Sequence, residues 1–285
     1  MDVENNNTYT KTGYLTSNIN FFHLIESEPK EFNFHYHDFH KVLIFISGNV
    51  SYQVEGKTYQ LNPYDIVLVN AGEIHKPIIH DETPYERIII YISSKFFDDY
   101  KNDDYDLFHC FSKASEHHSN LIRIKDISNT RLYTSIFELA KSFQSTEYAK
   151  QLYQQVLFTE FMIWVNRAVL NEDIIYQNAT IANKTILDIM NYITAHLCDD
   201  LTIDSISNYF FLNRSYLMHL FKSETGYTIG KYISEKRLFI SRRLIQNGMS
   251  ITDACFQSGF KNYTSFYRSF IKKFNTAPKN VRTII

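Results

Sequence analysis

Two short segments near the C-terminus carry side chains whose types and spacing suit contact with nucleic acid. The exposed faces expected at helical spacing consist of Arg214, Ser215, Met218 and His219 in one segment and Tyr263, Thr264, Tyr267 and Arg268 in the other. An arginine such as Arg268 can donate two hydrogen bonds to O6 and N7 of guanine, which discriminates between bases by ~1–3 kcal/mol. Lys222, Lys272 and Lys273 suit phosphate contacts, which position a protein without reading sequence.

The two segments belong to an internal repeat of helix-turn-helix shape. The expected helix, turn and helix cover 202–209, 210–213 and 214–225 in the first copy, and 250–257, 258–262 and about 263–274 in the second. Equivalent residues are 48 apart before the turn, as for Ile203 and Ile251, and 49 apart after it, as for Leu217 and Phe266. The second turn has therefore gained one residue.

Apolar residues and caps define each unit. The residues expected to be buried are Ile203, Ile206, Tyr209, Leu217, Leu220 and Phe221 in the first copy and Phe266, Phe270 and Phe274 in the second. Asn213 is a good N-cap, Ser250 to Asp253 matches a capping box, and Gly226 suits the left-handed end of a helix. A spacer helix over 229–244, rising about 1.5 Å per residue, can hold the recognition helices about one DNA turn, roughly 34 Å, apart.

Charge is unevenly distributed along the chain of 285 residues, whose net charge is −2. Residues 181–285 carry 14 Lys and Arg against 7 Asp and Glu, and the remainder carries 15 against 24. Since phosphate contacts dominate nucleic-acid affinity, the basic C-terminal part is the one expected to meet a polyanion. Taken alone, this signal is also compatible with an ordinary solvated surface.

The C-terminal segment resembles the AraC/XylS family of transcription regulators. The residues that carry the resemblance are 201–204, 216–226, Arg237, 251–254, 258–260 and 265–270, closing with Ala277, Pro278 and Arg282. The resemblance implies base contacts from Ser215, Met218 and His219 in the first unit and from Tyr263, Thr264, Tyr267 and Arg268 in the second. One position departs from the family pattern, because Phe211 stands in the first turn where glycine is usual.

Short apolar runs separated by turns fill residues 32–93, which predicts many antiparallel strands in a sandwich or barrel. A helical period follows over about 130–170, in two helices of which the second includes Leu152 and Val156 on its expected buried face. Such a hairpin could cover the barrel or pair with a second subunit. We favour dimerisation.

The N-terminal segment also resembles the cupin barrels, through His35-Tyr36-His37, Gly48 and the run 70–77 that contains His75. In metal-binding cupins two such histidines, a glutamate a few residues on and a later histidine converge as ligands. Here Lys41 stands where the glutamate would be. Because a cation opposes metal binding, three neutral imidazoles would have to hold a metal unaided, unless His40 turned inward.

We therefore expect a small-molecule site lined by His35, His37, Lys41 and His75, with no metal. Lys41 favours an acceptor-rich or anionic ligand, and the resemblance implies a sugar or another polar metabolite. The alternative is that these histidines only satisfy hydrogen bonds at strand ends.

The composition suits two folded domains without a membrane anchor. Hydrophobic residues make up 44% of the chain, including 23 Phe and 21 Tyr, and no apolar run approaches the ~20 residues of a membrane span. The first 13 residues lack the apolar region of a signal peptide, and three scattered cysteines favour neither disulfides nor zinc. We expect a cytoplasmic protein with a sensing and dimerisation domain over 1–170, a linker over 171–184 and a DNA-binding domain over 185–285.

The expected fold is α+β and multidomain, with a cupin-like antiparallel β-barrel and helical hairpin followed by an all-α domain with two helix-turn-helix units. The expected function is that of a homodimeric transcription regulator in which a small molecule changes operator binding or contact with RNA polymerase. Activation and repression are both compatible with this arrangement, and neither a catalytic residue nor a cofactor is assigned. The competing interpretations are a metal-dependent cupin enzyme with a helical appendage, and a DNA-binding protein whose N-terminal domain only dimerises.

Overall fold

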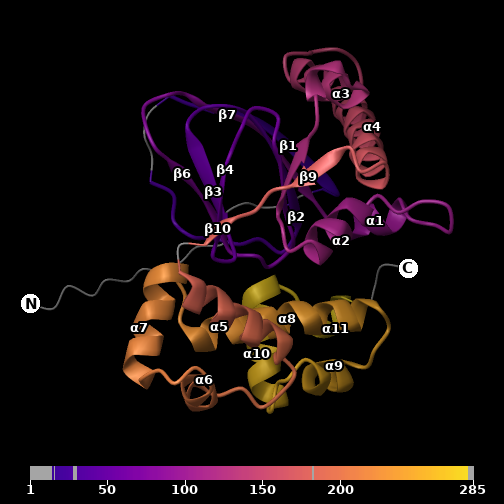
Figure 1. Ribbon diagram of the computed structural model, residues 1–285. Coiled ribbons are helices and arrows are strands. Elements are labelled where there is room, and N and C mark those ends of the chain that lie inside the picture. The colour runs from indigo at the N-terminus through magenta and orange to yellow at the C-terminus, as the bar shows by residue number, and fades with distance from the viewer. Residues whose placement is uncertain (1–14, 16, 28–30, 182, 282–285) are drawn as a thin grey trace, which may run out of the picture. The chain divides into compact units, whose positions relative to one another are not determined.

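The chain folds into two compact units, one ending at Thr180 and one beginning at Ile181 (Figure 1). The computed structural model describes residues 15, 17–27, 31–181 and 183–281, so Arg282 of the AraC-like pattern lies outside the described residues. The first unit is rich in antiparallel strands and the second is helical, which confirms the predicted fold class. Within the described ranges, no helix is both long and apolar enough to cross a membrane.

Among the residues that the structure describes, ten strands build the first unit. They are β1 (Ile19–Glu26), β2 (His40–Ser47), β3 (Val50–Val54), β4 (Lys57–Gln60), β5 (Ile66–Val69), β6 (His75–Ile79), β7 (Tyr85–Ile92), β8 (Leu121–Ile124), β9 (Ile174–Tyr176) and β10 (Thr180–Ile181), the last ending one residue into the second unit. The larger sheet has the order β1-β7-β2-β5-β8-β9 and the smaller one the order β10-β4-β3-β6. Glu55 and Gly56 both have positive φ, as a two-residue turn between β3 and β4 requires.

Alternate residues of β2 and β7 face opposite sides of the larger sheet. Val42 and Ile44 belong to an apolar core shared with the helices, whereas Leu43 and Phe45 pack in a second core with residues of the smaller sheet. The same alternation places Lys41 on the side of this second core. Lys41, the second residue of β2, is therefore directed into the barrel rather than to solvent.

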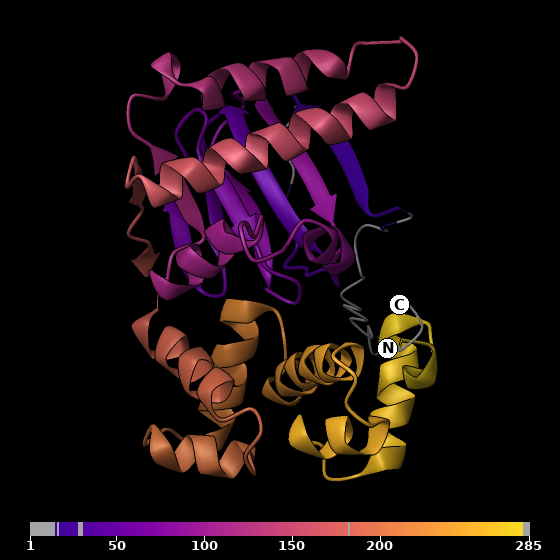
Figure 2. The same cartoon turned by 90° about the vertical axis from the view of Figure 1, so that its right-hand side faces the viewer.

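Helices cover the other face of the larger sheet. They are α1 (Ser94–Asp99), α2 (His109–Glu116), α3 (Arg131–Ser142) and α4 (Lys150–Leu170), with a 3-10 turn at Ile127–Asn129. The predicted hairpin exists as α3 and α4, which lie across the strands (Figure 2), and Phe158 packs edge-on against Phe21 at 5.8 Å between ring centres.

The buried face predicted for the second helix of the hairpin is wrong in its first turns. Leu152 and Val156 are 60% and 56% exposed, while Leu157 and Phe158 are buried. Helix α4 is apolar on more than one side, so a helical period alone did not identify the side that packs on the sheet.

Residues 171–184, expected as a linker, contain two of the strands. Strand β9 pairs with β8, with Ile175 opposite Arg123, and β10 joins the smaller sheet beside β4. Most of this segment is therefore part of the barrel.

Within the described part of the second unit, residues 181 and 183–281, there are seven helices. They are α5 (Lys184–Ala195), α6 (Ile203–Tyr209), α7 (Arg214–Thr225), α8 (Ile229–Gln246), α9 (Ile251–Gln257), α10 (Tyr263–Phe274) and α11 (Pro278–Val281). The pairs α6–α7 and α9–α10 are the two copies of the repeat, and α8 is the spacer between them.

The caps explain why both copies have the same helix lengths. Thr202 and Ser250 cap the first helix of each copy, and Asn213 and Asn262 cap the second. Gly226 and Asn275 end the second helices in the left-handed conformation. One expectation is wrong: Tyr209 is exposed and stacks on Tyr192, with ring centres 4.2 Å apart, instead of entering the core.

Candidate functional site

Helix α7 presents most of the polar face predicted for the first recognition helix. Leu217 and Phe221 are buried, whereas Ser215, Met218, His219 and Lys222 are exposed. Arg214 is exposed as well, but its Nη1 donates to both carboxylate oxygens of Asp204 on α6, at 2.8 and 2.9 Å. Arg214 therefore ties the two helices of the unit together.

Helix α10 presents the equivalent face in the second unit. Phe266, Phe270 and Phe274 are buried, as predicted, and the exposed side carries Tyr263, Thr264, Arg268 and Lys272. Tyr267 is half-buried and stacks on Tyr263. The structure thus brings the predicted base-reading residues of each unit to one surface of one helix.

The phosphate contact expected of Lys273 is not compatible with its position. Its side chain is buried, and its Nζ lies 2.6 Å from Oε2 of Glu235 on α8. This pair fastens α10 to the spacer helix, so Lys272 and Lys222 are the lysines of the two recognition helices that remain at the surface.

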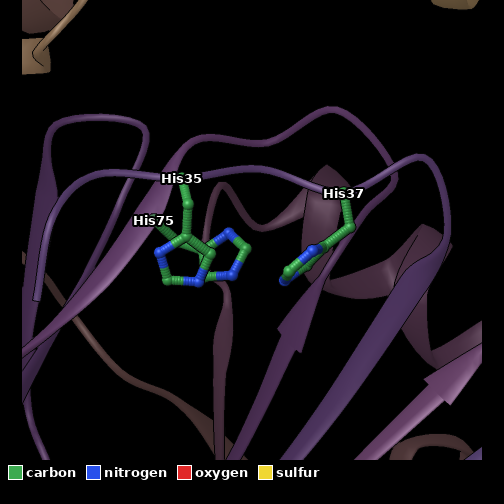
Figure 3. Close-up of side chains that lie close together, drawn as sticks. All are labelled: His35, His37 and His75. Atoms are coloured by element: carbon green, nitrogen blue, oxygen red, sulfur yellow. The ribbon is translucent and has the colours of Figure 1, made fainter. Parts of the chain in front are cut away.

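Three imidazoles meet inside the barrel unit, as Figure 3 shows. His35 and His75 exchange backbone hydrogen bonds of 3.1 and 2.9 Å, which places their rings 4.4 Å apart. The ring of His37 lies 5.2 Å from that of His35 and 5.0 Å from that of His75. Each of the three offers a ring nitrogen within 4.8 Å of the others.

Backbone carbonyls fix the tautomers of two of these rings. Nδ1 of His35 lies 2.9 Å from the carbonyl oxygen of Asn33, and Nδ1 of His75 lies 2.9 Å from that of Glu73. A carbonyl oxygen only accepts, so both Nδ1 atoms carry the proton and both Nε2 atoms present a lone pair. Burial, aided by Lys41, lowers the pKa of His35 to about 4 and that of His75 well below its ordinary value, so both rings are neutral near pH 7.

Lys41 completes the cluster. Its side chain is 4% exposed, and its Nζ donates to Oη of Tyr52 at 2.8 Å and lies 3.5 Å from Nε2 of His75. Among the described residues no carboxylate lies within ion-pair distance of this ammonium group. Burial, with a smaller effect of Arg87, lowers the pKa of Lys41 to about 7.

Arg87, the other cation directed into the barrel, has the carboxylate partner that Lys41 lacks. Arg87 on β7 is buried, forms an ion pair with Glu26 and donates to the carbonyl oxygen of Tyr85 at 3.1 Å. Its guanidinium carbon also lies 4.0 Å from the centre of the Tyr85 ring. Arg87 is therefore paired with a carboxylate within the fold, whereas the two groups within hydrogen-bond distance of Lys41, on Tyr52 and His75, carry no charge near pH 7.

The three imidazoles are close enough to share a metal ion, but a cation stands beside them. Nε2 of His75, which would have to bind the metal, already faces the Lys41 ammonium group, and a second positive charge there would be repelled. His40 does not supply the missing ligand, because it lies among Phe97, Phe108 and Phe111 beneath the helices. The cluster instead combines one strong donor with inward-facing acceptors.

Two family models match the chain, one on each unit. The model of an AraC-like ligand-binding domain matches residues 20–156, and that of a helix-turn-helix domain matches residues 206–284. The chain belongs to the AraC/XylS family of transcription regulators. The regulator thus combines a ligand-binding domain with a DNA-binding domain that holds two helix-turn-helix units.

Two of the similar proteins match most of the chain and one matches its C-terminal third. The HTH-type transcriptional activator RhaS is 20% identical in one Escherichia coli strain and 22% in Shigella sonnei, covering 88% of both chains in each case. ToxT from Vibrio cholerae is 17% identical over 94% of this chain and 99% of its own, with a TM-score of 0.37. The C-terminal domain of the response regulator yesN from Fusobacterium nucleatum is 26% identical over 33% of this chain and 93% of its own, with a TM-score of 0.32.

Two residues that lie beside the histidines and Lys41 in the barrel of the regulator were not identified from the sequence. Tyr52 lies on β3 and Arg87 on β7, and neither belongs to a histidine motif. Arg87 does carry a signal: of the two charged residues in the run 85–92, Glu86 and Arg87, it is Arg87 that has the parity of Ile89, a residue of the second core. Tyr52 carries none, because its contact with Lys41 depends on how the two sheets face each other.

Proposed function

We propose that the regulator controls transcription in response to a small polyhydroxy carboxylate, such as a sugar acid, held in its barrel. The observation that carries this proposal is the buried ammonium group of Lys41, which has no counter-charge among the described residues. Burying an unpaired charge costs several kcal/mol, and a carboxylate beside Lys41 would recover part of that cost. The Nε2 lone pair of His35 would accept a hydrogen bond from a hydroxyl group on the same ligand.

Calorimetric titration of the full chain tests the ligand class. The panel pairs each neutral sugar with its uronic or aldonic acid, so that each comparison changes only the carboxylate. The proposal expects the acids to bind more tightly. Tighter binding of the neutral sugars, or binding of acids that survives Lys41→Met unchanged, would contradict it.

The alternative of a metal-dependent cupin enzyme makes a different prediction about metal content. An enzyme of that kind would purify with, or take up, a stoichiometric transition metal. We expect substoichiometric metal by elemental analysis, even after incubation with Zn²⁺ or Ni²⁺ and gel filtration. A stoichiometric ion that is lost in His75→Ala would favour the enzyme.

We infer activation rather than repression from the curated relatives, which carry the name of transcriptional activators. In this proposal the DNA-bound regulator contacts RNA polymerase, and it works in the cytoplasm, where its operator is. The ligand changes operator affinity or polymerase contact only if it binds two states of the protein with different affinity.

A homodimer is supported by an apolar stripe on α4. Leu152, Val156, Ile163 and Leu170 are all exposed, and the last three are seven residues apart. A seven-residue apolar repeat on one helix fits the seam of a coiled coil with a second copy. The same helix buries Phe158 and Phe161 in its own domain, so the stripe adds an interface without disturbing that core.

Two charges on the stripe test this interface. Val156→Glu with Ile163→Glu should shift the full chain from dimer to monomer in sedimentation velocity, because each charge would be buried in the seam. Glu138→Gln, on the neighbouring helix α3, serves as a control that should stay dimeric. A dimer that resists the double substitution places the interface elsewhere.

A further inference from the structure

The loop between α5 and α6 is fastened to the spacer helix by one side chain. Arg237 on α8 donates from Nε to the carbonyl oxygen of Leu197 at 2.7 Å and from Nη2 to that of Asp199 at 2.8 Å. These carbonyls belong to the loop that leads into the first helix-turn-helix unit. Arg237 thus holds the entry to that unit against α8.

The turn of the second unit packs against the same arginine. A Cβ atom on Gly259 would lie 2.4 Å from the Leu197 carbonyl oxygen and 2.8 Å from Nε of Arg237. Real Cβ atoms do not approach so closely, and Gly259 also has a φ of +91°. Only glycine lets this turn close onto the arginine and onto the loop of the first unit.

The second turn is one residue longer than the first, and the additional residue lies beside the contact with Arg237. Phe211 and Leu212 are equivalent to Gly259 and Phe260, and Asn213 is equivalent to Asn262, so the additional residue is Lys261. Its Nζ forms an ion pair with Asp200, in the same loop that Arg237 holds. Two independent contacts therefore tie the second turn to the entry of the first unit.

Phe211 shows that the turn itself does not require glycine. It occupies the equivalent position with a φ of 53°, and its side chain is 94% exposed. Gly259 is therefore required by its neighbours and not by the helix-turn-helix geometry. What distinguishes the second turn is its contact with the first unit.

We propose that Arg237, Gly259 and Lys261 form a joint that fixes the spacing and orientation of the two recognition helices, so that the chain accepts two DNA half-sites at one separation only. Arg237 acts here as a positioning residue, since its donors are used on backbone carbonyls. The inference rests on DNA reading by both units. One inserted base pair moves a half-site by about 3.4 Å and turns it by about 34°, which a fixed pair of helices cannot follow.

The test begins with a selection from random double-stranded DNA by the full chain. The selected operator is then rebuilt with one base pair removed from or added to the segment between its half-sites, and affinities are measured by fluorescence anisotropy. The wild type should lose ~10-fold or more in affinity on either change, the cost of misplacing one base contact or more. Arg237→Met should bind all three spacings within ~3-fold of each other.

Matched variants separate the joint from other roles. Arg243→Met removes the same charge from an exposed position of α8, and Phe211→Gly changes the equivalent turn, so both should keep the wild-type spacing profile. Arg237→Lys should retain part of it. Should Arg237→Met not fold by circular dichroism, the exposed Lys261→Ala with Asp200→Ala provides a milder opening of the joint, with a partly flattened profile.

An unchanged spacing profile in a folded Arg237→Met protein overturns the proposal. So does a selected site with a single half-site, because a fixed pair of helices would select both. A selection that enriches no motif at all contradicts DNA reading itself and is thereby distinguished from failure of the joint.

Discussion

Lys41 is destabilising in the free protein, because its charge is buried without a counter-ion among the described residues. We predict that Lys41→Met raises the free energy of unfolding by ~1–2 kcal/mol at pH 7 and abolishes binding of the acidic ligand. Thermal unfolding and calorimetry on the same samples measure both effects. A surface lysine of the same unit, Lys95, should give no change in either when replaced by Met.

The sign of the pH dependence follows from the same residue. The folded chain holds the Lys41 pKa near 7, below its ordinary 10.5, so the unfolded chain binds more protons between these values. Stability should therefore rise with pH through this window, and the advantage of Lys41→Met should shrink as it does. A gain from Lys41→Met that stays constant from pH 7 to pH 10 would show that its cause is not charge.

Ligand affinity should change in the opposite direction with pH. A carboxylate needs the charged ammonium group, so its affinity should fall by about tenfold per pH unit above pH 7, until the pKa of Lys41 in the complex is reached. Burial raises the pKa of Tyr52 and lowers those of His35 and His75, so these three neighbours of Lys41 keep their charge state in this range. Calorimetry between pH 6 and pH 9 measures the slope, and a flat profile contradicts a role for the Lys41 charge.

The sequence predicted that three histidines and Lys41 lie together, and the structure places them in one cluster. That this cluster binds a ligand is a proposal. His35 and His37 point to one side because they are two residues apart, and Lys41 follows the alternation of β2. His40 has the other parity and therefore lies under the helices. Tyr52 was not predictable, because the contact between β2 and β3 depends on the packing of two sheets.

At the scale of single elements, we expect different side chains of α7 and of α10 to read bases and to contact phosphates. Arg268→Ala should remove the preference for the selected operator over random DNA while leaving weak, salt-dependent binding. Lys222→Ala should instead weaken all sequences alike and reduce the slope of log affinity against log salt by about 0.9. Mobility-shift assays at several salt concentrations distinguish these outcomes, and an Arg268→Ala protein with its preference intact refutes the assigned role.

The helices of the second unit could be delimited from sequence because their end signals are local. Asn213 and Ser250 cap helices where expected, and Gly226 ends one. Strand β9 was missed because three residues form a strand only through their pairing with β8. The inner face of α4 was misassigned because a helix that is apolar on more than one side does not reveal which side meets the sheet.

At the scale of the whole molecule, the chain joins a domain that can bind a small molecule to one that reads DNA. Each unit has its own core, so each can respond to its own ligand. Coupling between them is a free energy, typically ~1–3 kcal/mol, and it is reciprocal. An acid that strengthens operator binding must therefore itself bind more tightly when operator is present.

The most direct test of the central claim is a selection from random double-stranded DNA with the full chain, read by sequencing. The account predicts one enriched operator with two half-sites about one helical turn apart, roughly 10 base pairs, each read by one recognition helix. A folded chain that enriches no sequence above the starting pool would contradict it.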